Sequence, residues 1–166
     1  MTLAAVVGGV YAALTCLLPG PSYGPVQLRV AEGLAVLPYL FPAAAPGLTA
    51  GCLVANLLSP YGPFDLVVGT AATGLAALLT RRARSPLGAI AAPVVCNGVL
   101  VGGMLAFLQT GVRPGFFAAF LVNGGGVALG ELAACGLLGG VLLRTLPNIP
   151  ALRDQIPAHR LPKQRE

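Results

Sequence analysis

The sequence predicts an all-α integral membrane protein, a compact bundle of six transmembrane helices, and its composition and length carry that prediction. Of its 166 residues, 56% are hydrophobic and 9% are charged, and the mean hydropathy is +0.83. Water-soluble domains of this size do not show such values. At roughly 20 residues per span, the chain supplies about six spans with short connections. We therefore expect no attached soluble catalytic or nucleotide-binding domain.

The first apolar run, residues 2–18, predicts the first span. It carries no charge and stops at Pro19-Gly20-Pro21, where the missing amide donor of proline and the flexibility of glycine end a helix. No basic region precedes the run and no cleavage-site pattern follows it, so we expect it to remain as a span rather than to be removed as a signal peptide.

The later apolar runs predict the other spans. Residues 33–58 contain three prolines and form either one kinked span or two short ones. Residues 66–80 and residues 87–108 each predict a single span. Residues 116–143 would make about 42 Å of helix at 1.5 Å per residue, so we expect this last helix to tilt or to break at Gly124-Gly125-Gly126.

Clustered charges orient the bundle. Ten of the fifteen charged side chains lie at Arg81, Arg82 and Arg84 or between Arg144 and the C-terminus, and positive charge in short loops marks the cytoplasmic side. Five spans with an outer N-terminus and six with an inner one both satisfy this rule. With six spans, Arg29 and Glu32 also lie on the same side of the membrane as Asp65. We therefore predict a six-span domain over residues 1–145, both termini in the cytoplasm, and a basic, proline-rich tail over residues 146–166 without a packable face.

Four ionisable side chains within apolar surroundings are candidates for a ligand site, because an isolated charge in mid-membrane costs about 2.5–3.5 kcal/mol. Arg29 and Glu32 are three residues apart and form either a local ion pair at a helix start or part of the site. Asp65 either caps the helix that begins near Leu66 or belongs to the site. Glu131 has no Lys or Arg within a turn, so it is either protonated or met by a cationic or amide group.

Amide and tyrosine side chains in the same regions are weaker candidates. Asn56, Asn97 and Asn123 lie in different predicted spans, where amides commonly form interhelical hydrogen bonds. We expect that role for Asn97, whereas Asn56 and Asn123 lie nearer the predicted outer pocket. Tyr61 either stacks on a planar ligand or sits at the membrane interface, as tyrosines often do.

Ala4, Gly8 and Ala12 form a stripe of small residues at helical spacing in the first span. Such stripes allow a second helix to approach closely. The second helix belongs either to this chain or to a partner, and the stripe alone does not distinguish them.

The residues that are missing exclude several classes of function. The only lysine is Lys163 and the only histidine is His159, both in the tail, so there is no phosphate-binding loop, no Ser-His or Cys-His nucleophile pair and no histidine metal site in the membrane. The four cysteines are widely spaced. The basic residues flank apolar runs instead of forming an aromatic-interleaved face. We expect no enzymatic activity, no cofactor, no metal and no nucleic-acid partner.

Several segments together resemble the queuosine-precursor transporter family, the QueT-type substrate-binding (S) components of energy-coupling factor (ECF) transporters. The likeness spans roughly residues 4–143 and is most specific in the run Gly-Pro-x-Gln-x-Arg-x-x-Glu of residues 24–32. It continues in residues 51–57, 65–70 and 130–132. One departure is Ala31, where the family pattern has a serine.

The resemblance implies uptake of a 7-deazaguanine, such as an aminomethyl-deazaguanine or the queuine base, from outside the cell. The partners would be a transmembrane coupling subunit, which would dock on the stripe of Ala4, Gly8 and Ala12, and two ATPase chains. Carboxylates accept the adjacent N–H donors of a guanine-like edge. We expect acceptors from Glu32, Asp65 and Glu131, orientation from Gln27, Asn56 and Asn123, and an Arg29 that pairs with Glu32 or bonds the ring carbonyl. The alternatives are another purine-like or vitamin substrate, or a membrane assembly protein without a transport role.

Overall fold

The structure is a computed structural model that describes residues 2–18 and 29–161. Within these ranges the chain forms helices and connecting turns, and no strand. The predicted all-α class is therefore confirmed. Two helical stretches of this part of the chain, Pro86–Thr110 and Phe116–Asn148, are long and apolar enough to cross a bilayer. The six-span count remains a prediction.

The first half of the chain contains short helices. α1 (Thr2–Leu17) coincides with the predicted first span. The 3₁₀-helix η1 (Val30–Val36) runs directly into α3 (Leu37–Leu40), and a turn at residues 41–43 separates this stretch from α4 (Ala44–Asn56). The stretch that was ambiguous in the sequence thus contains two short helices.

The middle of the chain follows the predicted runs closely. A π-helical turn, η2 (Asp65–Gly69), continues into α5 (Thr70–Arg82). α6 (Pro86–Thr110) begins after Ser85, whose hydroxyl accepts a hydrogen bond from the Gly88 amide at 3.1 Å. It ends at Gly111, whose φ of 60° favours glycine.

The last long helix does not break at the three glycines, which was one of the two alternatives expected for it. α7 (Phe116–Ala133) passes through Gly124, Gly125 and Gly126 without interruption. The irregularity lies further on, in the π-helical segment η3 (Ala134–Gly139), before α8 (Gly140–Thr145). Glycine lowers helix propensity by only about 1 kcal/mol. Gly124 is the one that allows α6 to approach, since a Cβ there would lie 2.7 Å from the Gly98 carbonyl oxygen, whereas Gly125 faces open space.

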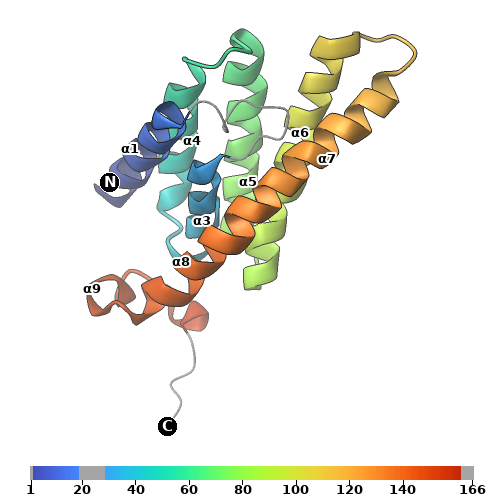
Figure 1. The fold of residues 1–166 in the computed structure, drawn as a ribbon. Helices are drawn as coiled ribbons and strands as arrows, with labels where there is room; N and C mark the ends of the chain where they lie inside the picture. The colour runs from blue at the N-terminus through green and yellow to red at the C-terminus, as the bar shows by residue number, and fades with distance from the viewer. Residues whose placement is uncertain (1, 19–28, 162–166) are drawn as a thin grey trace.

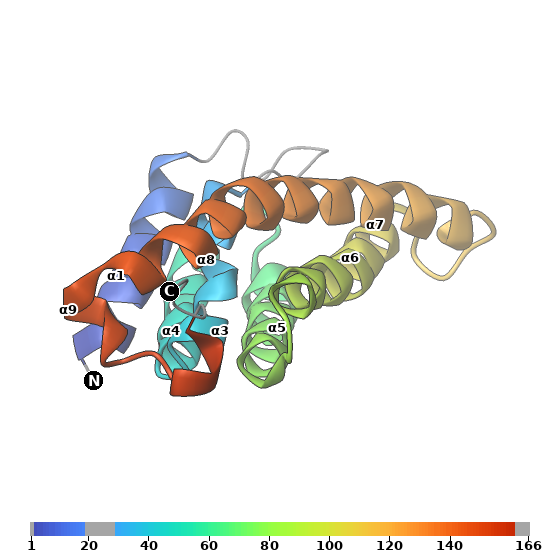
Figure 2. The same ribbon diagram turned by 90° about the horizontal axis from the view of Figure 1, so that it is seen from below.

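α1, α4, α5 and α6 pack in that order, each against the next, and α7 packs on α6 (Figure 1). α1 packs on α4, and α3 lies between α4 and α5. Seen from below (Figure 2), α7 and α8 form one long rod that crosses one side of α5 and α6 and reaches α3. The 3₁₀-helix η1 contacts both α1 and η3. Segments far apart in the sequence thus meet around residues 30–36.

The stripe of small residues in α1 packs within the same chain. A Cβ on Gly8 would lie 2.5 Å from the Gly47 carbonyl oxygen, and a Cβ on Gly47 would collide with the Ala4 carbonyl oxygen. Gly51 faces Gly8 in the same way. Of the two alternatives for this stripe, the structure shows the intramolecular one for Ala4 and Gly8.

The C-terminal segment packs against the helices, so the expectation of a tail without a packable face is wrong for residues 146–161. After the 3₁₀-turn η4 (Leu146–Asn148) come α9 (Pro150–Arg153) and the 3₁₀-turn η5 (Ala158–Arg160). Ile156 is buried in the same apolar cluster as Leu40 and Leu48, and Leu152 and Leu161 pack against this cluster. The apolar positions are spaced irregularly among prolines, so they give no helical periodicity in the sequence.

Candidate functional site

A cluster of buried polar side chains is contributed by α1, η1 and the residue before it, α4, η2, α6, α7 and η3. Arg29, Glu32, Asn56, Asp65 and Glu131 were predicted site residues, and all five are buried. Tyr11, Asn97 and Cys135 are buried beside them and bond to them. We refer to this set as the polar cluster: Tyr11, Arg29, Glu32, Asn56, Asp65, Asn97, Glu131 and Cys135.

Arg29 and Asp65 form the ion pair of the cluster. Arg29 Nη2 lies 3.0 Å from Asp65 Oδ2, and the two side chains are 6% and 0% exposed. The hydroxyl of Ser59 donates to the same carboxylate oxygen at 2.7 Å. The expectation that Arg29 pairs with Glu32 is therefore wrong in this structure. Among the described residues, the Asp65 carboxylate accepts from Arg29 and Ser59 side chains and from no backbone amide of its helix, so the capping alternative is wrong as well.

Asn56 holds the start of η2 against the end of α4. Its amide nitrogen lies 2.9 Å from the Asp65 carbonyl oxygen, 3.2 Å from Thr70 Oγ1 and 3.3 Å from Cys52 Sγ. A side chain on Gly69 would overlap Asp65 Oδ1 and bring a Cβ within 3.0 Å of Asn56 Nδ2. Only glycine at position 69 leaves the Asp65 carboxylate and the Asn56 amide in their places.

Glu32 is anchored from two sides. The Tyr11 hydroxyl of α1 donates to Glu32 Oε1. The thiol of Cys135, in η3, lies 3.1 Å from the Glu32 carbonyl oxygen. The 3₁₀-helix that carries Glu32 is thus tied to the first and the last long helices.

Glu131 is met by an amide, as one of the two sequence alternatives requires. Asn97 Nδ2 of α6 donates to Glu131 Oε1 of α7 at 2.6 Å, and Cys135 Sγ lies 3.7 Å from Oε2. The interhelical role expected for Asn97 is confirmed. Its partner, however, is a candidate site residue, so Asn97 belongs to the polar cluster.

Irregular helical geometry accompanies each carboxylate. Glu32 lies in a 3₁₀-helix, Asp65 begins a π-helical turn, and the π-helical segment η3 follows Glu131 closely. π-turns within α-helices are rare and often occur at functional sites, because they redirect side chains and free backbone groups. Here these irregular turns coincide with the polar cluster.

Three acceptor atoms of the cluster lack a hydrogen-bond partner among the described residues. They are Glu32 Oε2, Asn56 Oδ1 and Asp65 Oδ1, all removed from solvent. An unsatisfied buried acceptor costs about 1–3 kcal/mol. All three atoms accept and none donates, so a complementary molecule would present N–H or O–H groups.

Two of the other predicted site residues, Asn123 and Tyr61, lie elsewhere. Asn123 is two turns before Glu131 on α7, where its amide donates to Gln109 Oε1 at 2.9 Å and to the Ala119 carbonyl at 2.8 Å. Tyr61 lies in the turn between α4 and η2 and packs on an apolar cluster that includes Val101 and Met104. Gln27 lies outside the described residues.

The sequence reasoning missed Tyr11, Cys135 and the site role of Asn97. A tyrosine in the interior of the first apolar run was an available signal, because a hydroxyl buried in an apolar helix needs a partner. The cysteine gave no such signal, since a lone buried cysteine usually serves as a small apolar residue.

Comparison with known proteins identifies one family. Residues 1–148 match the family described as QueT transporter. The match covers the elements from α1 to η4 and every residue of the polar cluster. No curated protein matches the chain, and no solved structure matches it. The expectation of a non-enzymatic membrane transport protein is confirmed, and the chain belongs to the QueT transporter family.

Proposed function

We propose that this chain is the membrane-embedded S component of an ECF importer that binds a 7-deazaguanine precursor of queuosine. In this proposal it spans the membrane six times with both termini in the cytoplasm. The polar cluster captures the ligand from outside. Transport then requires a separate coupling subunit and two ATPase chains.

The unsatisfied acceptors of the polar cluster are the observation that carries the proposal. A guanine-like edge presents a ring N–H beside an exocyclic NH₂, and a carboxylate accepts two such donors in a fork. Glu32 Oε2 and Asp65 Oδ1, on separate carboxylates, have no hydrogen-bond partner among residues 2–18 and 29–161, and Asn56 Oδ1 is the third such acceptor. A base rich in N–H donors offers the groups that these acceptors bind, and Tyr11 and Arg29 bond to the other oxygens, Glu32 Oε1 and Asp65 Oδ2.

The charge of the cluster favours a ligand with an amine. Glu32, Asp65 and Glu131 contribute three carboxyl groups, and Arg29 is the single basic side chain that this part of the structure buries among them. Buried charges require partners. An aminomethyl group, cationic at neutral pH, would supply the second positive charge. Asp65 already pairs with Arg29 and Glu32 is three residues from Arg29, whereas Glu131 bonds to Asn97 and Cys135 and to no basic side chain of the described chain. We therefore assign the amine to Glu131.

The position of the C-terminal segment supports the proposed orientation. Arg160 Nη2 donates to the Arg81 carbonyl oxygen at 2.6 Å. The tail and the basic end of α5 therefore lie together, as the positive-inside rule requires if both face the cytoplasm.

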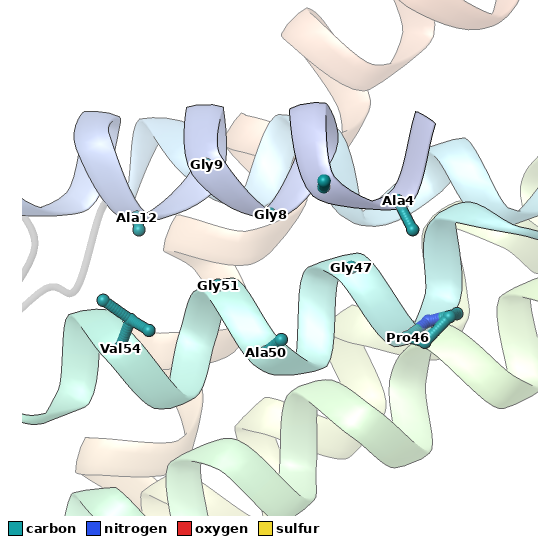
Figure 3. Close-up of a pocket in the computed structure, with 10 residues that line it drawn as sticks. Ala4, Gly8, Gly9, Ala12, Pro46, Gly47, Ala50, Gly51 and Val54 are labelled. Carbon is teal, nitrogen blue, oxygen red and sulfur yellow. The ribbon is translucent and has the colours of Figure 1, made fainter. Parts of the chain in front are cut away.

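The proposed docking surface for the coupling subunit is the groove between α1 and α4 (Figure 3). It has a volume of about 370 Å³ and is apolar. Gly8 is buried against α4, whereas Gly9 is exposed and has open space where a side chain would be. Small residues let a partner helix approach closely. The lining residues of the groove are Ala4, Ala5, Gly8, Gly9, Ala12, Pro46, Gly47, Ala50, Gly51 and Val54.

Mass spectrometry of small molecules that co-purify with the detergent-solubilised protein tests the substrate, and equilibrium binding quantifies it. We expect retention of a 7-deazaguanine without any ATPase present. Asp65→Asn and Glu32→Gln should each weaken binding by about tenfold or more, whereas Asp154→Asn in the C-terminal segment should not. Retention of a different vitamin, or of no small molecule, would refute the proposed substrate.

A further inference from the structure

We propose that the cavity beneath the C-terminal segment binds the phosphate headgroup of an anionic membrane lipid. The cavity has a volume of about 430 Å³ and lies between α3, the start of α6, the end of α8 and the turn η5. Arg144 comes from α8, and His159 and Arg160 come from η5. Basic side chains from two separate segments therefore converge on one cavity.

Arg160 is held at this cavity by contacts that leave one donor unused. Its guanidinium donates to the carbonyl oxygens of Tyr39 and Arg81 and lies 4.8 Å from the centre of the Tyr39 ring. Its Nε is buried and has no hydrogen-bond partner in the described part of the chain. A buried N–H without an acceptor is unfavourable. An anion bound in the cavity beside the Arg160 guanidinium would offer an acceptor to it.

Within the described part of the chain, no carboxylate side chain lines the cavity. Arg144 and Arg160 remain charged at any physiological pH, and the guanidinium fork suits phosphate oxygens. Arg81, Arg82 and Arg84 at the end of α5 add positive potential nearby. Asp154 is the acidic residue of the described tail, and it does not line the cavity.

The apolar part of the lining favours a lipid over free phosphate. Leu40, Leu143 and Leu161 line the cavity together with two prolines, Asn148 and Tyr39. The basic end of a transporter bundle lies at the level of the headgroups, where basic pockets bind anionic lipids. A headgroup phosphate can meet the arginines while glycerol and acyl carbons cover the leucines. Inorganic phosphate would leave that apolar surface uncovered.

Native mass spectrometry with defined lipids tests the site directly. The protein in detergent is titrated with dioleoyl phosphatidylglycerol and, separately, with dioleoyl phosphatidylcholine, which has the same chains and no net charge. We expect phosphatidylglycerol to be retained at least about tenfold more strongly, because each basic side chain near an anionic lipid adds binding energy. Equal retention of the two lipids would overturn the proposal.

Matched variants locate the binding. Arg144→Gln combined with His159→Gln removes two lining side chains without touching the bonds of Arg160. Arg82→Gln combined with Arg84→Gln removes two exposed charges at the same end that do not line the cavity. The first pair should reduce phosphatidylglycerol retention to the level of phosphatidylcholine, and the second should preserve the preference. Equal losses in both would show general surface attraction and overturn the site.

Inorganic phosphate distinguishes a lipid headgroup from free phosphate as the anion that the cavity binds. At millimolar concentration it should raise the unfolding temperature less than phosphatidylglycerol does, and it should not displace the bound lipid. Displacement of the lipid by phosphate alone would show that the cavity is a free-anion site. The lipid proposal would then be wrong.

Discussion

The Arg29 guanidinium lies 3.0 Å from the Asp65 carboxylate, and this buried pair joins the start of η1 to the start of η2 across 36 residues of sequence. The pair fixes two of the three carboxylate-bearing segments relative to each other. It also leaves Asp65 Oδ1 without a partner among the described residues. The same contact therefore orders the fold locally and presents an acceptor to a ligand.

Removing the cation from this pair should destabilise the protein strongly. Arg29→Met leaves the Asp65 carboxylate buried without its partner, which costs about 3–5 kcal/mol. Thermal unfolding in detergent, followed by the helical circular-dichroism signal, measures the loss. Arg113→Met, in an exposed turn, should leave the unfolding temperature nearly unchanged.

The double variant Arg29→Met with Asp65→Leu distinguishes the cost of an unpaired buried charge from the cost of disturbed helix packing. Replacing both buried ions by apolar groups is often neutral for stability, so the double variant should unfold at a higher temperature than Arg29→Met alone. If Arg29→Met unfolded at the same temperature as Arg113→Met, the buried pair would not be present in the protein.

Much of the helix order followed from the sequence. The first span, the runs at residues 66–80 and 87–108, and the start of the last helix coincide with α1, η2–α5, α6 and α7 to within a few residues. Uninterrupted apolar runs bounded by proline, glycine or arginine carry this information locally. The π-helical turns at Asp65 and Ala134 did not follow, because no residue type marks a π-turn.

The site was predictable as a set of residues but not as a set of bonds. The cost of burying charge identified Arg29, Glu32, Asp65 and Glu131 one at a time. The partners depend on which helices meet, and long-range packing decides that. Glu32 is three residues from Arg29, yet it bonds to Tyr11. Asn123 is on the helix of Glu131, yet it bonds to Gln109 near the far end of α6.

Glu131 should discriminate between ligands by charge. Glu131→Gln keeps a carbonyl oxygen that can accept the Asn97 hydrogen bond and removes the carboxylate. Affinity for an aminomethyl-deazaguanine should fall by about 10- to 100-fold, because hydrogen bonds to charged groups contribute about 1.5–3 kcal/mol. Affinity for the analogue without the amine should change much less. Isothermal titration of both ligands checks this, and equal losses would assign Glu131 a structural role only.

Substitutions at two adjacent glycines of α1 should distinguish docking of the coupling subunit from folding of the chain. Gly9→Leu projects into open space and should abolish uptake with little change in ligand binding, because it fills the proposed docking groove. Gly8→Leu would collide with the Gly47 backbone and should lower both the unfolding temperature and ligand binding. Uptake in cells and binding to the purified protein measure the two effects. Normal uptake by Gly9→Leu would place the coupling subunit elsewhere.

Gly69 should be required for binding, because its missing side chain leaves room for the Asp65 carboxylate. In Gly69→Ala the added methyl group overlaps Asp65 Oδ1 and crowds the Asn56 amide, so the carboxylate must rotate away from its present place. We expect deazaguanine affinity to fall by about tenfold or more, since a hydrogen bond to a charged group would be lost. Gly125→Ala is the matched control, because a Cβ there meets open space on a helix surface. If both variants bound the ligand as the unmodified protein does, Asp65 would not be a ligand acceptor.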